Sequence, residues 1–253
     1  MALDIPVIGF DPNSSVLDVP YSVNSSQFFL VWQPIHDVAH NACVGYEVLI
    51  RWDHPILGRI RPDIFIPIAE TSGRIIDIDA WVLRKACQEA ARCCSVSRFS
   101  VNVSSHSLMA PGFVDNVRWQ MNRHFIVPGR LELEITERAA VAPGALQVLE
   151  ELRAIGARIV IDDFGVGHSC LSALATLPID KVKLDRSFLL HHQTNPRCVV
   201  VIRSVIDLAH TLGFTVCAEG VETGDTLGLL QDLKCDEAQG YLLGRPEKLP
   251  PSY

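Results

Sequence analysis

Acidic and amide side chains recur along this chain where short strand-like segments would bring them together. In residues 131–136, period-two alternation puts Glu132 and Glu134 on one face and apolar side chains on the other. A second such segment gathers three charged side chains on one face: Lys181, Lys183 and Asp185. This alternation predicts half-buried strands whose polar faces carry side chains of the metal-ligand type.

Further polar side chains close other strand-like segments. They are Asn102, Asp162, Asp163, Glu219 and Gln239. For any one of them a solvated strand end is an equally good explanation, but recurrence at several strand ends favours a shared site. Oxygen ligands suit Mg²⁺ or Mn²⁺, whereas zinc is disfavoured because no Cys or His stands at these ends in ligand spacing.

The elements that must position these residues alternate between strand-like and helical patterns. We predict strands at residues 28–34, 45–51, 98–103, 130–136, 157–162, 181–185, 214–219 and 236–239. We predict helices near residues 62–71, 77–92, 112–124, 143–155, 169–176, 197–212 and 224–233. Strands joined mostly by helical crossovers predict an α/β fold, a TIM-like (β/α)8 barrel, with its chemistry at the C-terminal ends of the strands.

The connection between the first two strands departs from that pattern. Residues 36–44 are too few for a helical crossover, because a parallel connection needs about a dozen residues or more. We therefore expect one strand, the first or the second, to be antiparallel. An open doubly wound sheet is the alternative architecture, and it is weakened because no G-x-G-x-x-G follows an early strand.

Composition limits the classes of partner. The 29 acidic residues outnumber the 22 Lys and Arg residues, and the net charge of -7 disfavours a nucleic-acid polymer. A small anionic ligand remains possible where metal ions supply positive charge. The eight cysteines form no C-x-x-C pair, which favours reduced thiols in a cytoplasmic protein. No apolar run reaches the roughly 18 residues of a membrane span.

The chain divides into two parts by pattern. Residues 1–26 mix Pro, Asn, Ser and Asp without a sustained period, and we expect an N-terminal tail or linker. Residues 27–253 carry all the predicted elements, so we expect them to form one domain of the size typical for a single barrel.

Taken in order, motifs from about Phe28 to Pro250 resemble those of the EAL family of cyclic di-GMP phosphodiesterases. Residues 45–52 are similar to the family's opening E-A-L-x-R-W, with Val48 in place of Ala. The other matching motifs are Gln33-Pro34, Phe65-Ile66-Pro67-Ile68-Ala69-Glu70, Val101-Asn102-Val103-Ser104, Glu134-Ile135-Thr136-Glu137, Asp162-Asp163-Phe164-Gly165, Lys183-Leu184-Asp185-Arg186-Ser187-Phe188, Ala218-Glu219-Gly220-Val221-Glu222 and Gln239-Gly240-Tyr241.

The resemblance implies a site that holds two divalent ions, Mg²⁺ or Mn²⁺. The implied metal ligands are Glu47, Asn102, Glu134, Asp162, Asp163, Glu219 and Gln239, with Asp162 bridging the two ions. The implied catalytic residues are Glu47, Lys183 and Glu219, and Lys183 would hold the attacking water. The implied substrate contacts are Gln33, Leu49, Arg51, Asp185, Glu222, Tyr241 and Pro246, and Glu137 would anchor the loop after Asp163.

The activity implied by the resemblance is hydrolysis of cyclic di-GMP to linear 5′-pGpG, which lowers this second messenger in bacterial signalling. A homodimer through the loop after Asp163 and the neighbouring helix is also implied. Val166 and His168 replace the Thr and Tyr usual in the family, so we expect altered loop dynamics or altered dimer coupling around a preserved site. The alternatives are a weak or inactive module that acts as a cyclic di-GMP receptor or protein-interaction domain, and a barrel enzyme with another substrate.

Overall fold

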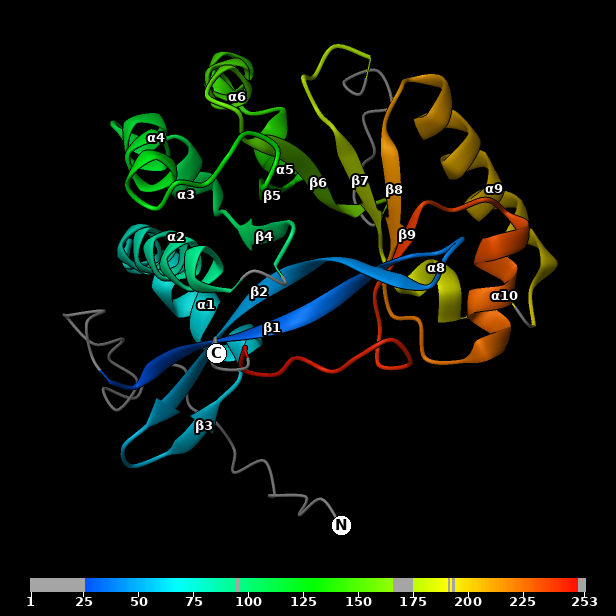
Figure 1. Ribbon diagram of the computed structural model, residues 1–253, viewed down its shortest axis with the longest axis horizontal. Helices are drawn as coiled ribbons and strands as arrows, with labels where there is room; N and C mark the ends of the chain where they lie inside the picture. The colour runs from blue at the N-terminus through cyan, green and yellow to red at the C-terminus, as the bar shows by residue number, and fades with distance from the viewer. Residues whose placement is uncertain (1–25, 94–95, 166–174, 191, 193, 250–253) are drawn as a thin grey trace.

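Eight strands close into a barrel in the computed structural model, which describes residues 26–93, 96–165, 175–190, 192 and 194–249 (Figure 1). The sheet has nine strands in the described residues, and all except β3 belong to the barrel. They are β1 (Phe28–Asp37), β2 (Ala42–His54), β3 (Gly58–Ile60), β4 (Phe99–Asn102), β5 (Leu131–Thr136), β6 (Arg158–Phe164), β7 (Lys181–Leu184), β8 (Thr215–Ala218) and β9 (Glu237–Ala238). Their order in the sheet is β1-β9-β8-β7-β6-β5-β4-β2-β3, and an additional β1–β2 pairing closes the ring. The open doubly wound alternative is therefore wrong, because an open sheet would leave β1 with a free edge.

The antiparallel strand is the first one. β1 runs antiparallel to both of its barrel neighbours, β2 and β9, whereas β2 runs parallel to β4. The cause lies in the short connection, since only residues 38–41 separate β1 from β2 and a tight turn must reverse the chain. The hairpin is longer than predicted, and β3, which pairs with the end of β2 outside the barrel, was not predicted.

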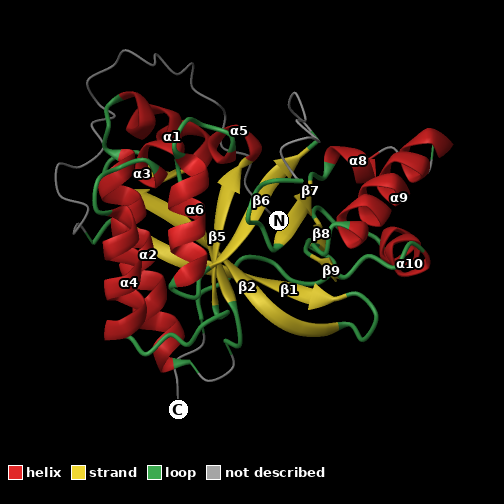
Figure 2. Cartoon of the chain, turned by 90° about the horizontal axis from the view of Figure 1, so that it is seen from above, coloured by secondary structure: helices red, strands yellow, loops and turns green. Residues whose placement is uncertain are grey.

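Helices surround the barrel as the crossover pattern predicts. They are α1 (Pro62–Thr71), α2 (Ile75–Arg92), α3 (Ser105–Leu108), α4 (Phe113–Arg123), α5 (Glu137–Ala140), α6 (Ala145–Ala154), α8 (Ser187–Leu190), α9 (Pro196–Thr211) and α10 (Gly224–Asp232). Seen from above, α1 to α6 lie on one side of the strands and α8 to α10 on the other (Figure 2). The one-turn helices α3, α5 and α8 were not predicted, because four residues carry too little periodicity to detect.

One predicted helix and one predicted segment fall mainly outside the described residues. Within the predicted helix 169–176, residues 169–174 lie outside them, and Ala175 and Thr176 belong to a turn. The predicted tail is likewise almost wholly outside, so the expected boundary near residue 26 stays a prediction.

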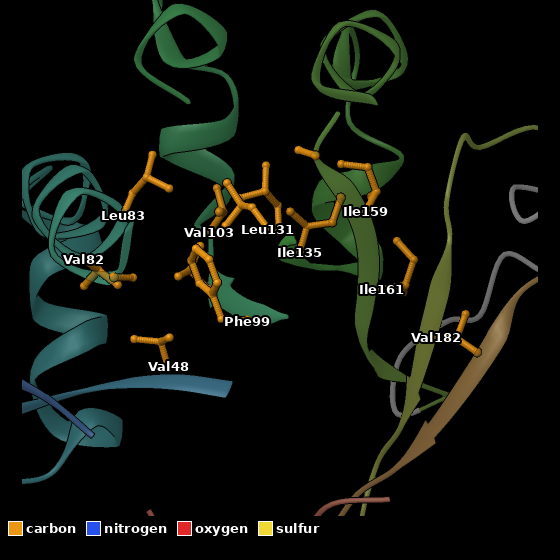
Figure 3. Packing of buried hydrophobic residues seen from close by; sticks show 14 of the residues in the cluster. Val48, Val82, Leu83, Phe99, Val103, Leu131, Ile135, Ile159, Ile161 and Val182 are labelled. Atoms are coloured by element: carbon orange, nitrogen blue, oxygen red, sulfur yellow. The ribbon is translucent and has the colours of Figure 1, made fainter. Parts of the chain in front are cut away.

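The apolar core lies between the outer face of the barrel and the helices. Leu131, Leu133 and Ile135 are buried there, as their alternation predicts. Figure 3 shows Val82 of α2 beside Phe99 on β4, with Leu131 close by. Each such side chain stabilises the fold by about 1.5–3 kcal/mol when fully buried. This packing holds the strand ends in register and leaves the inner faces to polar residues.

The inside of the barrel at the N-terminal ends of the strands carries a lower ion network, formed by Arg98, Glu132, Arg158, Lys181 and Glu237. Lys181 Nζ lies 2.6 Å from Glu132 Oε2 and 2.7 Å from Glu237 Oε2. Arg98 contacts both carboxylates, and Arg158 lies 3.2 Å from Glu132. Three cations thus neutralise two buried acids.

Candidate active site

A second charged group lies above the lower ion network, at the mouth of the barrel. Its centre is the buried ammonium of Lys183, which comes from β7. Four carboxylates from four other parts of the barrel surround this Nζ atom: Glu219 at 2.5 Å, Glu134 at 2.8 Å, Glu47 at 3.3 Å and Asp162 at 3.5 Å. We call these five residues the mouth cluster. The polar faces of β5 and β7 meet here, as the alternation of their residues predicts.

Amide side chains fix the orientation of Glu47. Asn102 Nδ2 donates to Glu47 Oε1 at 2.9 Å, and Gln239 Nε2 donates to Glu47 Oε2 at 2.7 Å. The same Gln239 nitrogen lies 3.0 Å from Gln33 Oε1, and Gln33 Nε2 donates to the carbonyl oxygen of Gly244 at 3.2 Å. Glu47 is therefore held on both oxygens, which restricts its rotamer before any ligand arrives.

Asp162 and Asp163 do not close the strand as predicted, because β6 continues through both to Phe164. The register of β6 against β7 shifts between Ile161 and Phe164, and Asp163 has a left-handed φ of 53°. Asp tolerates this conformation better than most residues. The bulge turns consecutive carboxylates to the mouth, and Asp162 Oδ1 accepts a 3.0 Å hydrogen bond from the Asp163 backbone N–H.

Burial and crowding of like charges shift the pKa values at the mouth. Burial raises the pKa of Glu134 well above its ordinary value, and Glu47 adds to the effect. Burial also raises the pKa of Glu219 to about 7, despite the opposing charge of Lys183. Burial alone would lower the pKa of Lys183, but the surrounding carboxylates raise it well above its ordinary value. The mouth cluster therefore has more negative charge than its single ammonium neutralises.

The donor set fits a hard divalent cation. Four carboxylates face one ammonium, and the buried Oε1 atom of Gln239 accepts no hydrogen bond from the described part of the chain. Within that part no three acidic, His or Cys side chains form a ready-made metal site, and the Lys183 ammonium takes the central place instead. All-oxygen ligands and uncompensated negative charge are the conditions under which Mg²⁺ or Mn²⁺ binds.

Of the substrate contacts implied by the resemblance, some lie beside the mouth cluster and others do not. Leu49 and Arg51 line a cavity beside the mouth cluster. Burial raises the pKa of the Asp163 carboxyl, and the charges of Asp162 and Asp185 add to this shift. Tyr241 is 53% exposed, and Pro246 is partly buried in the same C-terminal segment. Glu222 is exposed and pairs with none of the described residues, so the structure does not bring it into the cluster.

Glu137 begins α5 and is partly buried. The loop that we expect it to anchor includes Val166 and His168, which lie outside the described residues. Its anchoring role and the effect of these two substitutions therefore stay predictions.

The cavity has a volume of about 410 Å³ and opens between β2, α1 and α2 next to the mouth cluster. Ile66, Pro67 and Asp79 contribute to its wall, and none of them is among the ligand contacts predicted from the sequence. Burial raises the pKa of Asp79, whose Oδ2 accepts a 2.9 Å hydrogen bond from the backbone N–H of Ser104. The motif around Pro67 was visible in the sequence, but Asp79 stands inside an ordinary helical pattern and gave no signal.

Solved structures with this architecture are known. The chain superposes on the structure of the Pseudomonas aeruginosa MucR phosphodiesterase in complex with cyclic di-GMP with a TM-score of 0.83 and 37% identity, covering 88% of this chain and 92% of that one. It also resembles the EAL domain of Mycobacterium smegmatis DcpA, with a TM-score of 0.73 and 32% identity over 87% of this chain and 91% of that one.

Curated relatives are longer proteins. The chain is 37% identical to the bifunctional diguanylate cyclase/cyclic di-GMP phosphodiesterase MucR of Pseudomonas aeruginosa, over 90% of this chain and 34% of MucR. It is 37% identical to the cyclic di-GMP phosphodiesterase NbdA of the same organism, over 89% of this chain and 30% of NbdA. The chain thus spans about a third of the length of these relatives.

No helix in the described ranges combines the length and apolarity needed to cross a bilayer. The EAL domain family matches residues 17–246, which includes every strand of the barrel and every residue of the mouth cluster. This chain belongs to the EAL domain family.

Proposed function

We propose that this chain hydrolyses cyclic di-GMP to linear 5′-pGpG with the help of two Mg²⁺ or Mn²⁺ ions. The observation that carries the proposal is the convergence of Glu47, Glu134, Asp162 and Glu219 on one point at the mouth of the barrel. The cyclic di-GMP complex of the similar MucR phosphodiesterase supports the substrate.

The proposed metal ligands are the oxygen-bearing side chains at the mouth: Glu47, Asn102, Glu134, Asp162, Asp163, Glu219 and Gln239. Divalent ions bound there would screen the charge of the phosphodiester and lower the pKa of the attacking water. Four crowded carboxylates repel one another without such cations, so ion binding and order at the mouth are coupled.

The remaining steps belong to side chains of the protein. Lys183 donates a hydrogen bond that holds the attacking water, and Glu219, which directly follows β8, contacts the same water. Water oxygen bonds to phosphorus while the bond from phosphorus to the 3′ oxygen breaks. A proton goes to the departing oxygen, so the products carry a 3′ hydroxyl and a 5′ phosphate. Arg51 contacts the phosphate, because its planar guanidinium suits phosphate oxygens.

The cavity beside the mouth suits one guanine base of the substrate. Ile66 and Pro67 offer apolar contact to the ring faces, and Leu49 borders the same space. The Asp79 carboxylate is a hydrogen-bond acceptor for the paired N–H donors on the guanine edge. The base would be oriented so that its ribose phosphate reaches the mouth cluster.

The decisive experiment incubates the protein with cyclic di-GMP and Mn²⁺ and follows pGpG by chromatography. We expect product from the wild type and none from Glu47→Ala, which should remain folded because Glu47 belongs to a cluster with excess negative charge. Unreduced turnover in Glu47→Ala would refute the assignment of this ligand. Binding of cyclic di-GMP without any product in the wild type would favour the receptor function instead.

We also propose a homodimer formed through the loop after Asp163 and the neighbouring helix, as the resemblance implies. Light scattering across a range of protein concentrations tests it. A specific activity that rises with concentration over the range where dimers form would link assembly to hydrolysis, whereas a monomer at every concentration would refute the dimer.

A further inference from the structure

A second pocket lies at the end of the barrel opposite the mouth, and we call it the lower pocket. It has a volume of about 450 Å³ and is bounded by the N-terminal ends of β6, β7 and β8, which are neighbours in the sheet. Its described wall comes from Arg153 at the end of α6, Arg158 at the start of β6, segment 175–180 and segment 212–215. No residue of the mouth cluster takes part in this wall, so the lower pocket is separate from the candidate active site.

Arg158 connects the lower pocket with the lower ion network. Its Nη1 atom lies 3.2 Å from Glu132 Oε1, and its side chain is 26% exposed where that of Glu132 is 1% exposed. The guanidinium therefore reaches from the buried network to the pocket. Glu132 also pairs with Lys181 and Arg98, so its negative charge is compensated without Arg158. Arg158 is thus a cation that can serve a second anion.

Arg153 is the second cation in the wall, and Asp180 holds it in place. Arg153 Nη2 donates to Asp180 Oδ1 at 3.1 Å. The other carboxylate oxygen of Asp180 accepts a 2.8 Å hydrogen bond from the backbone N–H of Ile159, and its carbonyl oxygen accepts one of 3.2 Å from the backbone N–H of Thr215. Asp180 is therefore fixed by its neighbours. The Arg153 guanidinium has five N–H donors, and its contact with Asp180 uses one of them.

The charges at this end of the barrel favour an anion. Among the described residues, the lower pocket and the lower ion network together hold four cations and three acids. The cations are Arg98, Arg153, Arg158 and Lys181, and the acids are Glu132, Asp180 and Glu237. Asp236 stands nearby, but it pairs with His210 at 2.8 Å and is not part of the pocket wall. The mouth cluster, in contrast, has an excess of acids.

The lower pocket also has an apolar part. Leu177, Leu212 and Phe214 line it and are only partly buried, so apolar surface remains open there. A volume between about 300 and 1,000 Å³, with apolar side chains and a few convergent polar groups, is typical of a small-molecule site. The planar guanidinium groups of two arginines match the oxygens of a phosphate. The chemistry therefore suits a phosphate group attached to a small apolar body.

We propose that the lower pocket binds a small organic phosphate. Arg153 and Arg158 contact the phosphate group, and Leu212 and Phe214 contact the apolar body. The site needs no divalent ion and has no part in the cleavage of cyclic di-GMP. It stands independently of the proposed hydrolysis, because none of its residues belongs to the candidate active site.

The test measures dissociation constants by calorimetry in EDTA at constant ionic strength. Phenyl phosphate is the probe that carries both a phosphate and an apolar ring, and inorganic phosphate is the probe without the ring. The variants are Arg153→Gln, Arg158→Gln, Arg158→Lys and Phe214→Leu. Arg118→Gln is the matched control, because Arg118 is 47% exposed and pairs with one Asp, whereas Arg153 is 44% exposed and also pairs with one Asp. Arg118 lies on α4 and is not part of the pocket wall.

The wild type should bind both probes, and phenyl phosphate more tightly. Each glutamine variant in the lower pocket should weaken phenyl phosphate binding about tenfold, the value expected for losing a hydrogen bond to a charged group. Arg158→Lys should retain part of the affinity, since it keeps the charge without the planar fork. Phe214→Leu should weaken the binding of phenyl phosphate alone, and Arg118→Gln should weaken neither. Arg153 is exposed, so Arg153→Gln tests the site even if Arg158→Gln is unstable.

A wild type that fails to bind phenyl phosphate at concentrations up to tens of millimolar would overturn the proposal. Wild-type affinity in both Arg153→Gln and Arg158→Gln would do the same. Affinity that is lost in Arg51→Ala but retained in the lower-pocket variants would place the anion at the mouth instead. Because the measurements are made in EDTA and follow binding alone, a failure of the proposed hydrolysis would leave these outcomes unaffected.

Discussion

Two charged groups are stacked inside the barrel, and they differ in balance. The lower ion network sets Arg98, Arg158 and Lys181 against two acids. The mouth cluster sets one ammonium against four acids. Along each strand, the lower residue is followed two positions later by the upper one. On β7 these are Lys181 and Lys183, and on β5 they are Glu132 and Glu134.

The difference in balance distinguishes a structural group from a site. Lys181 and Arg98 hold the pKa of Glu237 below its ordinary value against the opposing effect of burial, so the negative charge in the lower network is compensated by its own cations. At the mouth, burial and neighbouring acids raise the pKa of Glu134 instead. A buried group with uncompensated negative charge is stable only with a bound cation or proton.

The sharpest contrast comes from removing the central lysine of each group. Lys181→Met and Lys183→Met should each lower the free energy of unfolding by about 3–5 kcal/mol, because each leaves buried acids without a partner. Mn²⁺ should restore part of the loss in Lys183→Met, since a cation at the mouth can replace the ammonium. It should restore nothing in Lys181→Met. Urea unfolding in EDTA and in Mn²⁺ measures the free energy of unfolding of both variants. An equal gain from Mn²⁺ in the two variants would contradict the contrast between the two charged groups.

Metal addition to the wild type should produce the next largest effect. At a Mn²⁺ concentration of one hundred times Kd, binding to the folded state alone stabilises it by about 2.7 kcal/mol. Glu134→Gln should reduce the rise in Tm, and Glu132→Gln should preserve it despite a lower starting Tm. Thermal unfolding with and without EDTA checks this, and a larger reduction in Glu132→Gln would contradict the assignment of the two layers.

Neutralising one acid should change the free energy of unfolding in opposite directions in the two groups. Glu237→Gln should lose about 1–3 kcal/mol of stability at neutral pH, because a satisfied charged hydrogen-bond acceptor is removed. The folded pKa of Glu237 lies below its unfolded pKa, so this difference is present above the unfolded pKa and disappears as the pH falls through the folded one. In EDTA, Glu134→Gln should cost nothing or stabilise, because burial and the Glu47 charge raise the pKa of Glu134 and so disfavour its carboxylate form. Urea titrations at several pH values measure the free energy of unfolding of both variants and so distinguish the two effects.

The smallest effect is expected at Ser100, which is buried beside both groups. In the sheet it is paired with Glu47 on one side and with Glu132 on the other, and its hydroxyl has no partner among the described residues. Ser100→Ala should therefore stabilise the fold by about 1 kcal/mol without changing hydrolysis. Ser104→Ala is the matched control, and it should lose about 1 kcal/mol because the Ser104 hydroxyl caps α3. A destabilised Ser100→Ala would point to a partner beyond the described residues.

Local pattern was enough to predict most of the frame. Alternation in residues 131–136 predicted the apolar outer face and the acidic inner face of β5, and both are observed. The short connection after the first strand predicted the antiparallel pair. The bulge at Asp163 was not predictable, because a left-handed φ at one residue depends on the neighbouring strand rather than on the residue itself.

The sequence by itself determined which residue types stand at the strand ends, because period-two alternation and strand polarity are properties of a single segment. Only the tertiary structure decided which of those residues meet. Glu134 and Lys183 are 49 positions apart and become partners through the stagger of the closed barrel. Likewise, Arg98 donates to Glu237, which is 139 positions away in the sequence. This contact helps to balance the charges of the lower ion network. Charge balance is a sum over neighbours in space, so no single segment contains it.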